Sequence, residues 1–128
     1  MNFNIIAAAD DNGGIGLDNK IPWCEPDDMK FFSTITKGNG NNAIVMGNNT
    51  WKSLPNKPLK KRDNLILSRK TLEDGDGYKY FNNVDDVISY CRGKKYETVW
   101  IIGGAEIYKY FMDIDIVNTI YINRLNKN

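Results

Sequence analysis

Residues 14–32, GIGLDNKIPWCEPDDMKFF, form a glycine-hinged loop that runs through Pro-Trp into a segment with helical spacing. Pro26 suits the first turn of a helix because a backbone N–H there has no intrahelical partner. In a helix that begins near Pro26, Asp28 and Phe32 lie four residues apart on one face. The spacing predicts that Asp28 points inward beside a large ring, Trp23. A structural carboxylate that interacts with the helix dipole has the same spacing.

On either side of this stretch, short apolar runs alternate with segments of helical periodicity. The apolar runs predict strands, and the 3.6-residue spacing predicts helices. Interleaved strands and helices predict an α/β fold: a single domain over residues 1–128 with a central, mainly parallel, twisted sheet and helices on both faces. The expected strands are 3–9, 43–47, 63–68, 78–81, 98–102 and 116–123, and the expected helices are 26–37, 48–54, 84–91 and 105–112.

The composition is that of an ordinary globular chain. It has 128 residues, 41% of them hydrophobic and 26% charged, and a formal net charge of +1. This balance gives no broad basic field for nucleic acid or lipid, and no apolar run reaches membrane-spanning length. The first residues lack the basic start and the long apolar stretch of a signal peptide. We therefore expect a cytoplasmic protein whose partners include neither nucleic acid nor membrane.

Histidine is absent from the chain, and there are only two cysteines. The absence of histidine argues against Ser-His-Asp and Cys-His catalysis and against the common zinc sites, and we expect no metal. Proton chemistry then falls to a carboxylate, a tyrosine, a lysine or water. Cys24 and Cys91 are expected to be free thiols.

Two segments have the features of anion sites. Gly103-Gly104 follows the apolar run 98–102 and precedes a helix, so the backbone can approach a phosphate at a helix start. A tight strand-to-helix turn, however, also needs glycine. Thr50, near the start of the expected helix 48–54, can either help to hold an anion or cap that helix.

Four motifs, in this order, resemble those of the dihydrofolate reductase family. They are Pro22-Trp23 with Pro26-x-Asp28-Met29-x-x-Phe32; Met46-Gly47-x-x-Thr50-Trp51-x-Ser53; Lys57-Pro58-Leu59-Lys60-Lys61-Arg62-x-Asn64-Leu65-Ile66-Leu67-Ser68-Arg69; and Val99-Trp100-Ile101-Ile102-Gly103-Gly104-x-x-Ile107-Tyr108. The resemblance runs from residue 3 to about residue 124, and the C-terminal hairpin of the family has no counterpart. It implies a reductase domain truncated at its C-terminal end, either by itself or as the reductase portion of a bifunctional dihydrofolate reductase–thymidylate synthase.

The resemblance implies NADPH as the cofactor. In the family, the glycine pair is joined by a cis peptide beside the nicotinamide, and the residues matching Ser68 and Arg69 meet the adenosine 2′-phosphate. The loop from Asp11 to Trp23 resembles the mobile lid of the family. The implied cofactor-binding residues are Ala8, Ile15, Gly16, Asn19, Lys20, Gly47, Asn49, Thr50, Ser68, Arg69, Gly103, Gly104, Ala105, Glu106 and Ile107.

Two features qualify the cofactor assignment. Asn48 and Asn49 stand where the family usually has basic residues, which predicts a weaker preference for NADPH over NADH. Arg69, with Lys70 adjacent, offers a planar fork for a phosphate, although a solvated surface charge has the same sequence pattern.

The same resemblance implies reduction of 7,8-dihydrofolate by hydride transfer with carboxylate-assisted protonation. Asp28 would orient the pterin and, through water near Trp23, raise the basicity of the adjacent nitrogen. Tyr108 would lie near the nicotinamide or, as an ordinary helix aromatic, pack on the sheet. Arg62 would clamp the carboxylate of the glutamate tail, and Asn123 replaces the usual threonine. The implied substrate-binding residues are Ile6, Ala8, Asp28, Met29, Phe32, Leu54, Leu59, Arg62, Ile102 and Asn123.

Alternatives to a complete reductase stay open at the level of the sequence. Without the hairpin, the strand 116–123 would expose an apolar edge, and we expect self-association or a fused or complementing chain there. A non-catalytic or weakly active nucleotide-binding or assembly module of the same fold is the main alternative function. A related reductase that acts on a deaminated riboflavin precursor is a weaker one, since Asp28 and Arg62 favour folate.

Overall fold

The computed structural model describes residues 2–9, 33–54, 59–70 and 73–124, and for residues 7–9 and 122–124 it describes the backbone alone. Residues 33–37 are helical. The other elements, in chain order, are β1 (Asn2–Ala9), β2 (Asn42–Gly47), α2 (Asn48–Ser53), β3 (Asp63–Leu67), β4 (Tyr78–Phe81), α3 (Val84–Lys94), β5 (Thr98–Gly103), α4 (Ala105–Asp113) and β6 (Thr119–Arg124).

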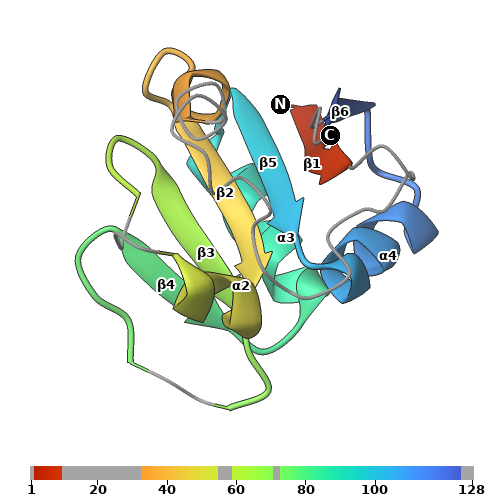
Figure 1. The fold of residues 1–128 in the computed structure, drawn as a ribbon. Helices are drawn as coiled ribbons and strands as arrows, with labels where there is room; N and C mark the ends of the chain where they lie inside the picture. The colour runs from red at the N-terminus through yellow and green to blue at the C-terminus, as the bar shows by residue number, and fades with distance from the viewer. Residues whose placement is uncertain (1, 10–32, 55–58, 71–72, 125–128) are drawn as a thin grey trace.

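The described strands form one parallel sheet in the order β4-β3-β2-β5-β1-β6. Figure 1 shows the twist of this sheet, with β1 and β6 at one edge and β3 and β4 at the other. The predicted α/β class is confirmed, and every described strand pair is parallel. Because parallel strands all end at the same edge, the loops after β2, β3, β4 and β5 gather at the carboxyl edge, where open α/β sheets bind their ligands.

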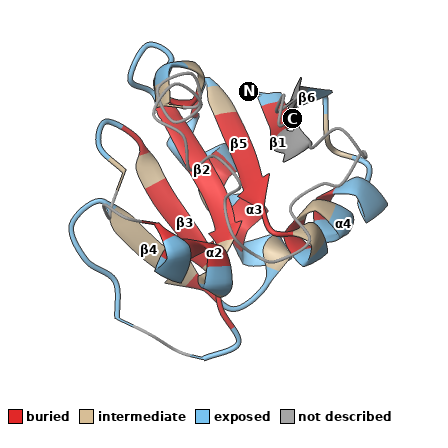
Figure 2. Ribbon diagram, viewed as in Figure 1, coloured by how far each residue is buried: buried red, intermediate tan, exposed pale blue. Residues whose placement is uncertain are grey.

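Each face of the sheet carries its own hydrophobic core. On one face, Val87 and Cys91 of α3 and Phe111 of α4 pack against strand side chains such as Ile5 and Ile101. The residues packed on the other face are Ile6, Ile44, Met46, Trp51, Leu54, Ile66, Trp100 and Ile102, with Ile35 of the helical segment 33–37 beside them. Figure 2 shows the central strands buried. Near-continuous apolar runs, as in β5, are what strands covered on both faces require.

Helix α3 is longer than the sequence pattern predicts. It begins after Asn83, whose side-chain oxygen accepts a hydrogen bond from the Asp86 N–H at 2.8 Å. It continues past the expected end at Cys91 to Lys94 and closes at Lys95, which has the left-handed φ of 58°. The apolar periodicity ends at Cys91 because the last turn faces solvent, so the pattern marks the buried part of the helix and not its end.

The last strand starts later than predicted. We expected a strand over residues 116–123, but β6 begins at Thr119, because Ile116 and Val117 pack beside the α3 and α4 core instead. Asn118 fixes the entry: its N–H donates to the Phe3 carbonyl at 2.7 Å, and its side-chain oxygen accepts from the Phe3 N–H at 2.9 Å. Partial burial of two apolar residues in a connection therefore gives the same sequence pattern as the start of a strand.

Candidate functional site at the carboxyl edge of the sheet

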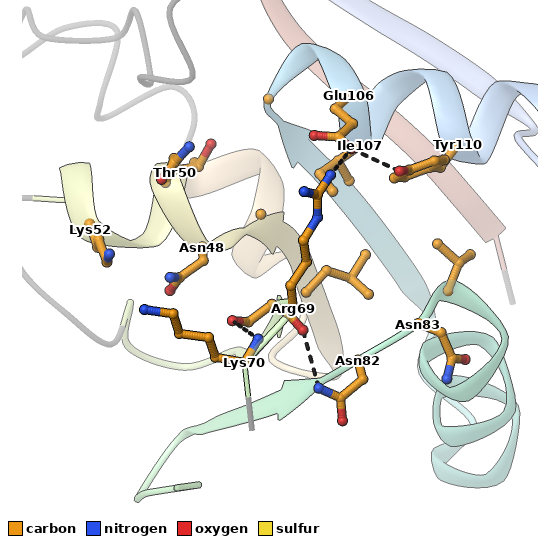
Figure 3. A pocket seen from close by; sticks show the side chains of 16 residues that line it. Asn48, Thr50, Lys52, Arg69, Lys70, Asn82, Asn83, Glu106, Ile107 and Tyr110 are labelled. Atoms are coloured by element: carbon orange, nitrogen blue, oxygen red, sulfur yellow. Dashed lines mark hydrogen bonds and ion pairs between the residues drawn. The ribbon is translucent and has the colours of Figure 1, made fainter. Parts of the chain in front are cut away.

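A cavity of about 650 Å³ lies where β2, β3, β4 and β5 end, a volume typical of small-molecule sites. Of the residues expected to bind a cofactor, it brings together Gly47, Asn49, Thr50, Ser68, Arg69, Gly104, Glu106 and Ile107. These residues come from three separate strand ends. The described part of the chain therefore gathers eight of the fifteen expected cofactor-binding residues around one hollow, which Figure 3 shows from close by.

The turn after β5 requires glycine. The Gly103–Gly104 peptide bond is cis, as the sequence resemblance implied, and Gly103 has a φ of +123°, which L side chains rarely adopt. A Cβ on Gly103 would lie 3.2 Å from the hydroxyl oxygen of Tyr108. Gly104 precedes α4, and its carbonyl accepts hydrogen bonds from the N–H groups of Ile107 and Tyr108 at 3.0 Å each. The backbone at the start of α4 therefore carries no side chain of its own at Gly103 and Gly104.

A second glycine lets the end of β2 approach the same turn. A Cβ on Gly47 would lie 3.2 Å from the Ile107 Cγ1 atom and 4.0 Å from the Gly103 carbonyl oxygen. Thr50, in the helix that follows, is buried beside the cavity. A side chain at either glycine would press on Ile107 or Tyr108, so both positions need glycine for the two strand ends to lie close together.

The outer wall of the cavity is charged. Arg69 extends from the end of β3 toward α4, where its Nη2 atom lies 3.4 Å from Glu106 Oε1, and the Tyr110 hydroxyl donates to the same oxygen at 2.8 Å. This hydrogen bond to Glu106 raises the pKa of Tyr110. Lys70 points away from Glu106 in Figure 3. Arg69 is 91% exposed, so the pair is solvated.

The residues beneath Arg69 hold the end of β3 in place. The Ser68 N–H donates to the Phe81 carbonyl at 2.9 Å, and the Ser68 carbonyl accepts from the Asn82 side-chain amide at 3.2 Å. The Ser68 hydroxyl oxygen accepts from the Lys70 N–H at 3.2 Å. The backbone that carries Arg69 is therefore held in place by hydrogen bonds, although the guanidinium group itself is exposed to solvent.

Tyr108 joins the end of β5 to β1. Its hydroxyl donates to the Ile6 carbonyl at 2.9 Å, and burial raises its pKa above the ordinary value of 10.0. The neutral phenol therefore persists throughout the physiological pH range. Of the two sequence interpretations, packing on the sheet is observed, and the ring also lies against Gly103.

A second cationic site lies at the opposite end of β3. Arg62 is 8% exposed, and its guanidinium donates to the Thr36 hydroxyl at 2.7 Å, to the Lys60 carbonyl at 3.0 Å and, at 3.4 Å and 3.5 Å, to the carbonyl and hydroxyl oxygens of Ser33. None of these described partners is a carboxylate. Desolvation lowers the pKa of Arg62 from 12.5 to about 10, so the group stays charged at neutral pH. A buried cation held by neutral acceptors can attract an external anion.

Asn64 ties down the turn that carries Arg62. Its fully buried side chain accepts from the Leu59 N–H at 3.0 Å and donates to the carbonyls of Leu59, Arg62 and Gly77 at 2.9, 3.0 and 3.2 Å. The amide therefore closes residues 59–62 into a fixed loop and joins that loop to the start of β4.

The remaining predicted residues fall into three groups. Ile6, Leu54 and Ile102 are buried in one core, with Leu59 packed at its margin. Ala105 begins α4 beside Gly104, and Ala8 pairs with Asn123 in the register of β1 and β6. Those outside the described residues are Ile15, Gly16, Asn19, Lys20, Trp23, Asp28, Met29 and Phe32.

Some cavity residues were not among the predicted site residues. They are Asn48, Lys52, Leu67, Lys70, Asn82, Asn83, Val84 and Tyr110. The end of β4 at Phe81 would have indicated Asn82 and Asn83, because every parallel strand delivers its following loop to the same edge. Tyr110 lies four residues after Glu106, on the same face of α4.

Comparison with known proteins identifies the fold family. The family model for dihydrofolate reductase matches residues 2–128. The chain belongs to the dihydrofolate reductase family. It is 33% identical to the dihydrofolate reductase of Heliothis virescens over 100% of this chain and 75% of that protein. The solved structure of Schistosoma mansoni dihydrofolate reductase superposes with a TM-score of 0.83 at 31% identity, covering 100% of this chain and 76% of that one.

Members of the family also occur within longer proteins. The chain is 34% identical to the bifunctional dihydrofolate reductase-thymidylate synthase of Plasmodium chabaudi, over 88% of this chain and 26% of that protein. The family assignment makes the chain an oxidoreductase of folate metabolism. Within the described ranges, no helix combines the length and the apolar character needed to cross a membrane.

Proposed function

We propose that the chain reduces 7,8-dihydrofolate to 5,6,7,8-tetrahydrofolate with NADPH. The observation that carries the proposal is the cavity at the carboxyl edge, where the bare backbone at Gly47 and Gly103-Gly104 meets the Ser68-Arg69 strand end. Membership of the dihydrofolate reductase family supports this assignment.

The residues that line the cavity support the proposal of a dinucleotide cofactor. Gly104 and the first turn of α4 would face the pyrophosphate, because a helix start offers N–H donors and a partial positive charge. Thr50 and Gly47 would lie along the opposite side, and Arg69 would meet the 2′-phosphate. When bound, NADPH supplies the hydride. The expected weaker preference over NADH, from Asn48 and Asn49, belongs to this proposal, and Asn48 and Asn49 both line the cavity.

The substrate would lie between the apolar residues Ile6, Leu54 and Ile102 and the charged group of Arg62. Arg62 is suited to a carboxylate, because its desolvation is already incurred in the folded protein and Thr36 holds its fork in place. Asp28 would orient the pterin and help to protonate the nitrogen next to the carbon that accepts hydride. The role of Asp28 rests on the family resemblance, and the role of Arg62 rests on that resemblance together with its buried position.

The test is NADPH oxidation on addition of dihydrofolate, for wild type and Asp28→Asn. We expect turnover in the wild type and a loss of roughly 100-fold or more in Asp28→Asn, with NADPH affinity unchanged. NADPH binding without any wild-type turnover would instead favour the nucleotide-binding or assembly module. No NADPH binding at all would contradict both assignments.

We also propose that another strand covers the edge at β6. Among the described strands, β6 pairs only with β1, and Ile120 and Tyr121 are 45% and 41% exposed. Such an edge readily accepts a further strand. A second copy of the chain or a fused or complementing partner would supply it. Sedimentation velocity tests self-association: a dimer or larger species supports pairing between copies, and a stable monomer over a wide concentration range counts against it.

A further inference from the structure

We propose, on the basis of the cofactor site described above, that Glu106 controls how strongly the chain prefers a 2′-phosphorylated nucleotide. Its carboxylate forms an ion pair with the guanidinium of Arg69 and so competes with the phosphate for that group. The 3.4 Å Arg69–Glu106 pair therefore acts as an internal counter-ion that a 2′-phosphate has to displace. A nucleotide without that phosphate has no need to displace it.

The arrangement joins two walls of the cavity. Arg69 follows β3, whereas Glu106 and Tyr110 lie one turn apart on α4, and all three line the hollow. Glu106 is the one acidic side chain among the described lining residues. The Tyr110 hydroxyl, 2.8 Å from Glu106 Oε1, holds the carboxylate on the side of Arg69. A phosphate bound at Arg69 would therefore lie near a carboxylate of like charge.

The solvent exposure of the Arg69–Glu106 pair sets the expected size of the change in nucleotide affinity. The side chains of Arg69 and Glu106 are 91% and 58% exposed, so water and salt weaken their attraction. Removing the carboxylate charge should raise the affinity for a 2′-phosphate roughly twofold to fivefold, and high salt should shrink the gain. Glu106 also lies in the first turn of α4, where it can repel the pyrophosphate. The informative quantity is therefore the ratio of affinities for two nucleotides that differ only in the 2′-phosphate.

Isothermal titration calorimetry with 2′,5′-ADP and with 5′-AMP measures that ratio without any turnover. We expect Glu106→Gln to raise the 2′,5′-ADP to 5′-AMP affinity ratio roughly twofold to fivefold, and Tyr110→Phe to raise it less. In an Arg69→Gln background, the Glu106→Gln gain should shrink, because the group for which the carboxylate competes is absent and only its direct repulsion of the phosphate is left. Asp113→Asn is the matched control: it removes an exposed acidic charge from the other end of α4 and should leave the ratio unchanged.

The outcomes separate this inference from the cofactor assignment. An unchanged ratio in Glu106→Gln, with both nucleotides still bound, overturns the role of Glu106 alone. An equal rise in Asp113→Asn also overturns it, because the effect would then be one of net charge. If the wild type binds neither nucleotide, the cofactor site is wrong and the inference falls with it.

Discussion

Two arginines stand at opposite ends of β3 and meet opposite environments. Arg62, before the strand, is 8% exposed and donates to four neutral oxygens, whereas the Arg69 side chain, after the strand, is 91% exposed and pairs with Glu106. An anion that reaches Arg62 finds a fixed, desolvated fork, and one that reaches Arg69 finds a hydrated group with a partner already in place. The same residue type should therefore contribute much more binding free energy at the first site than at the second.

The largest expected effect is at Arg62. Arg62→Leu should weaken dihydrofolate binding by roughly 100-fold, because the charge-assisted contact to the tail carboxylate is lost. A tail-less dihydropterin should bind the variant as it binds the wild type. Dissociation constants for both ligands, measured by fluorescence titration, check this, with Lys60→Gln as a neighbouring control for charge. Equal losses for the two ligands would mean that Arg62 supports the fold and does not hold a tail.

Two asparagines provide the next test, since each ties one arginine site in place. Asn64→Ala should lower the free energy of unfolding by about 2–4 kcal/mol, because buried carbonyls lose their donor. Asn82→Ala, at an exposed residue with one bond to the Ser68 carbonyl, should cost less than about 1 kcal/mol. Urea denaturation of both variants measures the difference. Similar costs would break the contrast between a buried and an exposed site.

A smaller effect is expected from alkaline pH. The pKa of Arg62 is lowered to about 10, so its positive charge is fully present well below that pH and is lost as the pH rises through it. Raising the pH from about 8 to about 10 should therefore reduce the preference for dihydrofolate over a tail-less dihydropterin by roughly twofold, the fraction deprotonated at the pKa. Affinities for both ligands across this range provide the measurement. A preference that grows with pH would contradict a cationic tail site.

The smallest change in affinity should come from a conservative substitution of the exposed arginine, Arg69. Arg69→Lys retains the charge but loses the planar fork, so NADP⁺ affinity should fall by less than about twofold. NAD⁺ affinity should not change. Calorimetric titration with both cofactors tests this, and a loss as large as that of Arg62→Leu for dihydrofolate would show that exposure does not separate the two sites.

The contrast also explains which features the sequence predicts. Gly103-Gly104 and Ser68-Arg69 are predictable because a strand end in a parallel sheet always points to the same edge, and glycine there has a steric reason. The burial of Arg62 could not be predicted from the sequence, because an arginine is ordinarily a surface residue. Its partners Ser33 and Thr36 come from a helix that is distant in the sequence. The pairing of Arg69 with Glu106 spans 37 residues and depends on the tertiary fold.

Deuterium transfer examines the reductase assignment most directly. The chain would be incubated with dihydrofolate and with NADPH in which deuterium replaces both hydrogens on C4 of the nicotinamide. The mass of the folate product would then be measured by mass spectrometry. Direct hydride transfer predicts tetrahydrofolate in which one deuterium replaces one hydrogen, so that it is heavier by a single mass unit than the product made with unlabelled NADPH. Unlabelled tetrahydrofolate, or cofactor bound without any product, would contradict it.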